Sequence, residues 1–470
     1  MTTDSAAPPR LLGVLFLGTL LAALDIAIVG PALPALREAF GLTERAVAWT
    51  FTAFVLANLA GLPVMAALAD RVGRRRVYLV DVAVFAAGTT VVALAPSFGV
   101  LLAGRVVQGL GASGIFPVAT AVVGDAYPPE RRGRAVGLLG AVFGVAFLIG
   151  PAIGGVLLAV ASWRWLFALS LPLAALVFVL SARTLPESRA AVPRPFDAAG
   201  VATLTILLAA LVVGLSGLDA SAPLDALAQP VVWGPLVLAA VLLGVLVRVE
   251  RQAPAPILRP GLVARRPVQA ACALAVGAGV VEATFVLLSS YAVAAFGVDR
   301  STASYLLLLL VAGVTVGAPV AGRMLDRVGA RPVVTVAMAL VAVGMGTVAA
   351  APSLAVHLVG TVVLGLGLSG ILGSSLAYIL LSEAGPDERA VAQGLSTIFL
   401  SVGQLVGAAT LAALATSSAT AVGGYRNGFA AITVGAVVLA GLARWLLGGA
   451  GAEASVPAGP LPSGRSRSLS

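Results

Sequence analysis

The sequence predicts an all-α membrane protein with fourteen transmembrane helices and both termini in the cytoplasm. Of its 470 residues, 60% are hydrophobic and only 10% are charged, and the mean hydropathy is +1.05. A soluble domain is far less apolar. Fourteen apolar runs are long enough to cross a bilayer. The runs are too long and too continuously apolar for barrel strands, so we expect helices.

About 20 mostly apolar residues span the hydrocarbon core, and this length defines the expected spans in chain order. The first six lie near 11–36, 46–69, 77–95, 97–123, 133–160 and 164–182. Two more follow near 198–216 and 231–248. The last six lie near 267–291, 301–322, 332–351, 354–381, 389–415 and 426–448.

The distribution of arginine predicts the orientation of these spans. All basic residues are Arg, and alternate loops and tails on one side hold 23 of them, against five on the other side. Cytoplasmic loops carry such an excess of positive charge. One missed or invented span would exchange the sides of all later loops, so the asymmetry supports an even number of spans. The same placement in short loops argues against nucleic acid as the reason for the net charge of +9.

The chain also repeats itself. ALADRVGRRR (67–76) is echoed by RMLDRVGARP (323–332), and GRVVQGLGASGI (104–115) is echoed by GTVVLGLGLSGI (360–371), each 256 residues later. Parallel halves of this kind are typical of one large transporter architecture. We therefore expect a six-helix bundle at 1–190, two inserted helices at 191–262, a second six-helix bundle at 263–448 and a disordered cytoplasmic tail at 449–470.

Four motifs resemble those of a known family. They are LDIAIVGPALP (24–34), ALADRVGRRR (67–76), RVVQGLGA (105–112) and AFLIGPAIGG (146–155). With them the chain resembles the major facilitator superfamily, and within it the drug:proton antiporter branch with fourteen transmembrane helices. The resemblance implies the major facilitator fold, two six-helix bundles with two added helices. Gly30 departs from the first motif, where relatives often carry Asn.

Three ionisable residues lie deep in the expected spans: Asp25, Arg105 and Glu282. Intramembrane charges usually face the interior of a helix bundle and pair or relay protons. A carboxylate in low dielectric takes up a proton more readily than one in water, so we expect these three residues to couple protons to transport around one cavity. The alternative is an Asp25–Arg105 ion pair that only ties the first helix to the fourth.

Two of these four motifs are expected to control conformation. Gly73 allows a tight turn, and neighbouring charges at the end of the second span predict a cytoplasmic gate that is repeated more weakly in the second half. Its residues are Asp70, Arg71, Gly73, Arg74, Asp326 and Arg327. The antiporter motif, Gly150, Pro151, Gly154 and Gly155, predicts a bent helix and a close seam between the halves. Positive-inside topology and ordinary helix packing are the alternatives.

A substrate pocket is expected from polar and aromatic residues in the spans. The candidates are Gln108, Asn58, Phe54, Phe116, Phe143 and Phe285. Such aromatic residues are alternatively core or lipid-facing. No nucleophile constellation, metal-ligand cluster or phosphate-binding loop occurs in the sequence, so we expect no catalytic residues, no metal and no cofactor beyond the proton gradient.

These observations predict a proton-coupled multidrug efflux antiporter rather than an enzyme. It would act as a monomer in the inner membrane of a bacterium and export amphipathic compounds, many of them cationic, by alternating access. Its partners would be protons, membrane lipid and the substrate, with no nucleic acid. One alternative is an exporter or flippase of an endogenous lipid, glycolipid or secondary metabolite, including an antibiotic made by its own host. A non-transporting membrane sensor is the third.

Overall fold

The computed structural model describes residues 9–189, 196–218, 223–254, 256–258, 260–372, 374–383, 389–415 and 418–446. In these ranges every regular element is a helix. Fourteen candidate spans are long and apolar enough to cross a membrane, as the hydropathy pattern predicts. The tail expected to be disordered, 449–470, lies outside the described residues.

The first bundle contains eight helices that make six spans. They are α1 (Pro9–Phe40), α2 (Glu44–Val72), α3 (Arg74–Ala93), α4 (Phe98–Ser113), α5 (Ile115–Ala126), α6 (Pro129–Val160), α7 (Arg164–Ala168) and α8 (Ser170–Thr184). The fourth span is interrupted at Gly114, which separates α4 from α5. Local sequence sets other ends: Thr43 and Ser97 cap α2 and α4 with their hydroxyl oxygens.

The inserted segment forms a pair of packed helices. Its helices are α9 (Ala198–Gly217), the short α10 (Pro223–Ala228), α11 (Pro230–Gln252) and the short α12 (Pro260–Val263). α9 and α11 pack on each other, and α9 also contacts α2 and α18. The insertion therefore lies against helices of both bundles.

The second bundle repeats the six spans of the first. They are formed by α13 (Arg266–Phe296), α14 (Arg300–Val328), α15 (Ala330–Ala350), α16 (Leu354–Leu372) with α17 (Ser374–Glu383), α18 (Arg389–Ala415) and α19 (Ala421–Leu446). The repeat extends to close helix contacts. A methyl group on Gly104 would lie 2.9 Å from the backbone nitrogen of Val92, and one on Gly360 would lie 3.0 Å from that of Val348. Each pair of positions is again 256 residues apart.

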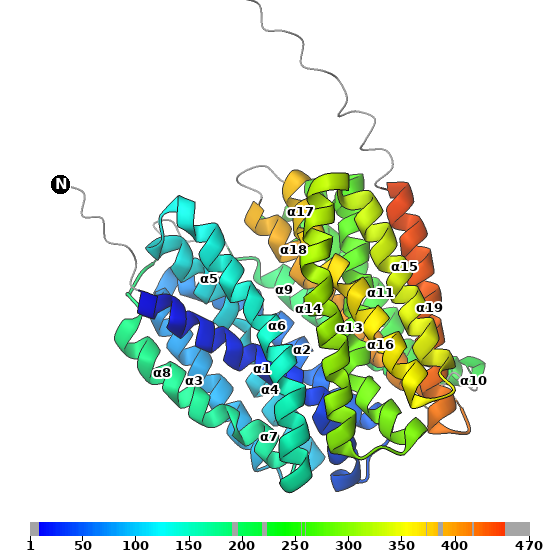
Figure 1. The fold of residues 1–470 in the computed structure, drawn as a ribbon. Coiled ribbons are helices and arrows are strands. Elements are labelled where there is room, and N and C mark those ends of the chain that lie inside the picture. Colours follow the sequence, from blue (N-terminus) through cyan, green and yellow to red (C-terminus); the bar gives the residue numbers. More distant parts are fainter. Residues whose placement is uncertain are drawn as a thin grey trace, which may run out of the picture.

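α1 begins and α19 ends on the same side of the molecule (Figure 1). We call the side that holds Pro9 and Leu446 the terminal side, and the opposite side the distal side. The bundles touch through α6 with α14, α2 with α18 and α1 with α13. Their ribbons diverge toward the terminal side (Figure 1).

Candidate functional site

A buried polar network links three helices of the first bundle. Nη1 of Arg105 on α4 donates to Asp25 Oδ2 on α1 at 2.6 Å and to Gln108 Oε1 at 2.8 Å. Gln108 Nε2 in turn donates to Asp25 Oδ1 at 2.7 Å and to the hydroxyl of Thr89 on α3 at 2.9 Å. All four side chains are fully buried. The structure thus brings Asp25 and Arg105 together as a direct ion pair.

Arg105 has further partners that fix its position. Its Nε donates to the carbonyl of Thr50 on α2 at 2.9 Å, and its guanidinium lies 4.3 Å from the ring centre of Phe54. Among the described residues its Nη2 has no hydrogen-bond partner. A guanidinium over an aromatic ring is attracted by the negative face of the ring. Phe54, which we expected in a substrate pocket, therefore packs on the ion pair.

The polar network belongs to the first bundle alone. At the repeat positions of Thr89, Arg105 and Gln108 the second bundle has Met345, Thr361 and Leu364. The echoed positions therefore carry one hydroxyl and no charge, and the two halves differ in chemistry although they share a backbone arrangement.

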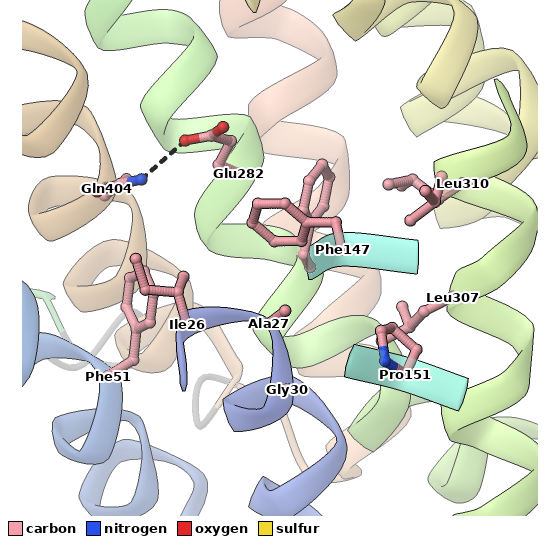
Figure 2. A pocket seen from close by; sticks show the side chains of 12 residues that line it. Ile26, Ala27, Gly30, Phe51, Phe147, Pro151, Glu282, Leu307, Leu310 and Gln404 are labelled. Carbon is pink, nitrogen blue, oxygen red and sulfur yellow. Dashed lines mark hydrogen bonds between the residues drawn. The ribbon is translucent and has the colours of Figure 1, made fainter. Parts of the chain in front are cut away.

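A small cavity lies between the two bundles. Figure 2 shows its lining, which comes from α1, α2 and α6 on one side and from α13, α14 and α18 on the other. Of the described side chains that line the cavity, only that of Glu282 is charged. Gln404 Nε2 donates to Glu282 Oε2 at 2.7 Å. The rest of the lining is apolar: Ile26, Ala27, Gly30, Phe51, Phe147, Pro151, Phe285, Leu307, Leu310 and Val311.

The three ionisable residues do not gather around this cavity, which differs from the expectation. Ile26 and Ala27 line the cavity, whereas the side chain of Asp25 is directed to Arg105 inside the first bundle. Successive residues of an α-helix point about 100° apart, so neighbours in sequence face different surroundings. The three ionisable residues instead occupy two separate sites: Asp25 and Arg105 lie in the buried network, and Glu282 lies at the cavity.

Of the expected pocket residues, Phe285 lines the cavity, where its ring meets that of Phe147 edge-on at 6.4 Å. Asn58 donates to the carbonyl of Gly109 at 3.4 Å. Phe116 and Phe143 pack edge-on against each other at 5.7 Å. Gln404 was missed, although a polar residue within an apolar span is the signal that could have revealed it.

The expected gate lies at the terminal side. Gly73 joins α2 to α3 with a φ of 121°, a conformation that favours glycine. Arg74 forms an ion pair with Asp125 of α5, donates to the carbonyl of Ala121 at 2.5 Å, and lies 3.9 Å from Asp70. All these partners belong to the first bundle.

The other gate residues, Arg71 in the first bundle and Asp326 and Arg327 in the second, are exposed in this conformation. The gate charges that the structure describes are thus engaged within their own bundle or open to the surroundings.

The antiporter motif packs against α1 and α14. A methyl group on Gly150 would lie 2.6 Å from Cβ of Ala27, and one on Gly154 would lie 2.9 Å from Cβ of Pro31. Gly155 lies against the ring of Tyr305. These glycines therefore permit close contact where a larger side chain has no room.

Polar contacts join the bundles at the distal end of the same seam. The hydroxyl of Ser304 donates to the carbonyl of Pro151 at 2.6 Å, and that of Ser301 donates to the carbonyl of Gly155 at 2.7 Å. Arg300 at the start of α14 forms an ion pair with Glu38 of α1.

The first turn of α14 is capped by Asp299. Its carboxylate accepts hydrogen bonds from the hydroxyl of Thr302 at 2.6 Å and from the backbone N–H of Thr302 at 2.9 Å. The hydrogen bond from the hydroxyl, and to a smaller extent that from the N–H, hold the pKa of the Asp299 carboxyl below its usual value. The cap is therefore ionised at neutral pH and fixes the helix end that carries the distal contacts.

Two helix bundles with an internal repeat and a cavity between them define a multi-pass membrane transporter. The family model described as Major Facilitator Superfamily matches residues 15–257 and 270–467. The chain belongs to this superfamily of transporters for small molecules and is not an enzyme.

Similar proteins include the uncharacterized MFS-type transporter YfiU of Bacillus subtilis. It is 30% identical over 410 residues, which cover 85% of this chain and 78% of the relative. The multidrug resistance protein B homolog of Mycobacterium tuberculosis is 29% identical and covers 87% of this chain and 76% of the relative. A mutant of the peptide transporter POT, solved in complex with alafosfalin, has the same fold, with a TM-score of 0.70, 17% identity and coverage of 94% of this chain and 95% of that chain.

Proposed function

We propose that the protein is a proton-coupled efflux antiporter that exports amphipathic compounds, many of them cationic, from a bacterial cell. The observation that carries this proposal is the cavity between the bundles, whose apolar and aromatic wall contains a single acid, Glu282, hydrogen-bonded to the uncharged Gln404. Such a site suits a molecule with an apolar body and one positive charge. Relatives named as multidrug resistance proteins support this substrate class.

Exchange follows if the substrate and a proton compete for the same carboxylate. A cation in the cavity is attracted by ionised Glu282, and a proton on that carboxylate removes the attraction. A proton that arrives from one side of the membrane then favours the release of the substrate there. No other charged side chain of the cavity lining opposes this competition.

The Asp25–Arg105 pair is proposed as the second element of coupling. A proton on Asp25 would leave the guanidinium of Arg105 buried without its counter-charge, which favours a different packing of α1 and α4. Conversely, the paired state stabilises the arrangement seen here. The network thereby links protonation to the position of α1.

Alternating access is supported by the asymmetry of the seam. The distal contacts of Ser301, Ser304 and Arg300 hold that side together, whereas the gate charges of the terminal side do not bridge the bundles. With both termini cytoplasmic, as the arginine distribution favours, this conformation faces the cytoplasm. We propose that the gate of Asp70, Arg71, Gly73 and Arg74 closes in the opposite state, while the antiporter-motif seam opens.

The test uses purified protein in proteoliposomes. An imposed pH gradient should drive uptake of a monocationic dye into proteoliposomes by the protein molecules that are inserted inside-out, and addition of the dye should release protons from the protein. If neither occurs while a lipid analogue is translocated instead, the protein is an exporter of lipid. If no solute moves at all, the transport proposal fails.

A further inference from the structure

A further buried acid lies outside both sites described above. Asp81 of α3 is fully buried, and neither of its carboxylate oxygens has a hydrogen-bond partner among the described residues. The hydroxyl of Tyr78, one turn earlier on the same helix, is also buried without a partner in this part of the structure. Asp81 is about two helical turns from Arg74, the first residue of α3, so it lies about 10 Å from the terminal end of that helix.

The break between α4 and α5 covers this acid. A methyl group on Gly114, the residue at the break, would overlap the Asp81 carboxylate, and one on Gly111 would lie 2.8 Å from the Asp81 carbonyl oxygen. Only glycine lets the backbone of α4 and α5 approach α3 so closely. The burial of Asp81 therefore depends on the docking of the α4–α5 break.

The charged groups of the surrounding helices are engaged elsewhere or exposed. Arg105 of α4 pairs with Asp25, Arg74 pairs with Asp125 of α5, and Arg164 of α7 donates to the carbonyl of Ala95. The remaining charged side chains on α2 and α8 nearest this end of the bundle are those of Asp70, Arg71 and Arg183. No hydrogen bond joins any of these described groups to the Asp81 carboxylate.

An ionised carboxylate in this place would lose its hydration without any compensating partner, which is strongly unfavourable. A neutral carboxyl avoids most of that penalty, because an unpaired polar group loses far less solvation free energy on burial than an unpaired charge. Water would return to the carboxyl if α4 and α5 moved away from α3, and ionisation would then be easy. Docking of the break and protonation of the acid therefore favour each other.

We propose that Asp81 is a proton-binding site, occupied while the α4–α5 break is docked on α3 and vacated when the break moves away. The docked form binds the proton more tightly, so acidification stabilises docking and a rise in pH weakens it. Because α4 also carries Arg105 and Gln108, this proton biases the helix that holds the Asp25 network. The inference concerns the protein without substrate and does not depend on what it transports.

The repeat supplies a built-in comparison. The residue 256 positions after Asp81 is Ala337, and a methyl group on Gly370, the counterpart of Gly114, would lie 2.7 Å from its Cβ. A methyl group on Gly367 would lie 2.8 Å from the Ala337 carbonyl oxygen, the same distance as at Gly111. The second bundle thus has the same close glycine contacts without the acid, although Gly370 lies within α16 and not at a helix break.

The test is hydrogen exchange by mass spectrometry on the full-length protein in lipid nanodiscs between about pH 5.5 and pH 8.5. After correction for intrinsic exchange chemistry, amides of 112–118 should exchange at least about fivefold faster at the high end, since one linked proton allows up to about tenfold per pH unit. Amides of 364–372 should show no such change. In Asp81→Asn the dependence at 112–118 should vanish, whereas in Asp25→Asn it should persist.

Infrared spectroscopy provides an independent measurement. The carbonyl band of a protonated carboxylic acid should be smaller in Asp81→Asn than in wild type at about pH 6 by the contribution of one group. Equal pH dependence at 112–118 and 364–372 in the wild type would overturn the proposal even if the variant failed to fold. A response to sodium at constant pH, with none to pH, would show that the site binds a metal cation and would equally refute it.

Discussion

Replacement of Glu282 by Gln tests the cavity most directly, because the amide keeps the size of the side chain and removes its charge. The carboxylate has one hydrogen-bond donor in the described structure, Gln404 Nε2 at 2.7 Å, and no basic residue among the side chains that line the cavity. A bound cation would therefore be its only charged partner there. Glu282→Gln should weaken the binding of a monocationic amphipathic dye while leaving the apolar wall intact.

The size of this effect follows from the charges. Two unit charges about 4 Å apart attract by about 4 kcal/mol at an effective dielectric constant of about 20. Removal of the cation and the carboxylate from water offsets part of that attraction. If about 1.5–3 kcal/mol remains, the Kd should rise by roughly 10- to 150-fold. For an uncharged analogue of the same shape, the binding free energy should differ between wild type and Glu282→Gln only by the difference between two hydrogen bonds, about 1 kcal/mol or less.

The assay compares the affinities of the cationic dye and its neutral analogue in wild type and Glu282→Gln, together with proton release on dye binding. Asp225→Asn, which neutralises an exposed carboxylate on α10, is the matched control and should behave as wild type. Proton release should be lost in Glu282→Gln. A fall in affinity of less than about threefold for the cation, or an equal fall for the neutral analogue, would refute electrostatic recognition by this residue.

Three further predictions concern the other contacts. Asp25→Asn should reach the membrane yet lose gradient-driven transport. The loss of the counter-charge should also lower the free energy of unfolding by about 3–5 kcal/mol. Adding Arg105→Gln should restore part of that stability, as measured by thermal unfolding. Ser304→Ala removes the hydroxyl that donates to the Pro151 carbonyl and should weaken distal closure by about 0.5–1.5 kcal/mol, seen as faster thiol labelling at that side. Because its pKa is lowered, Asp299 should keep α14 capped as the pH falls from about 7 to about 5 and lose the cap only as the pH drops through that lowered value. After correction for intrinsic exchange chemistry, hydrogen exchange at the start of α14 should stay constant over that range, but Asp299→Ala should speed it.

The helices could be predicted from the sequence because the signal for a membrane span is strong and local. Each span needs a long apolar run, and the repeat of 67–76 at 323–332 fixed the relation of the halves. The break at Gly114 was not predicted, since glycine is common within membrane helices.

The sites were harder to predict because they depend on the rotation of each helix. In a soluble protein the apolar face of a helix shows which side is buried, but in a membrane both the lipid and the protein interior are apolar. The sequence therefore predicts Asp25 as a proton-coupling residue, with an Asp25–Arg105 pair as the alternative, but it does not predict the separation of Asp25 from the cavity. The same ambiguity hid Ile26 and Phe51, which line the cavity but look like ordinary core residues in the sequence.

The separation of the two acids constrains how coupling could work under the proposed function. Glu282 is reached from the cavity, but Asp25 is sealed inside the first bundle, so a substrate in the cavity does not touch the ion pair. α1 connects them, because Ile26 and Ala27 on one of its faces line the cavity while Asp25 on another holds Arg105. A shift or rotation of α1 that accommodates a substrate must alter the geometry of the ion pair, and a proton on Asp25 must alter the cavity wall. Ile26→Trp places a larger side chain on the cavity face of α1 and leaves the face that holds Asp25 unchanged. It should therefore change the pH dependence of transport as well as the affinity for the substrate. An altered affinity with an unchanged pH profile would mean that the two acids act without communicating through α1.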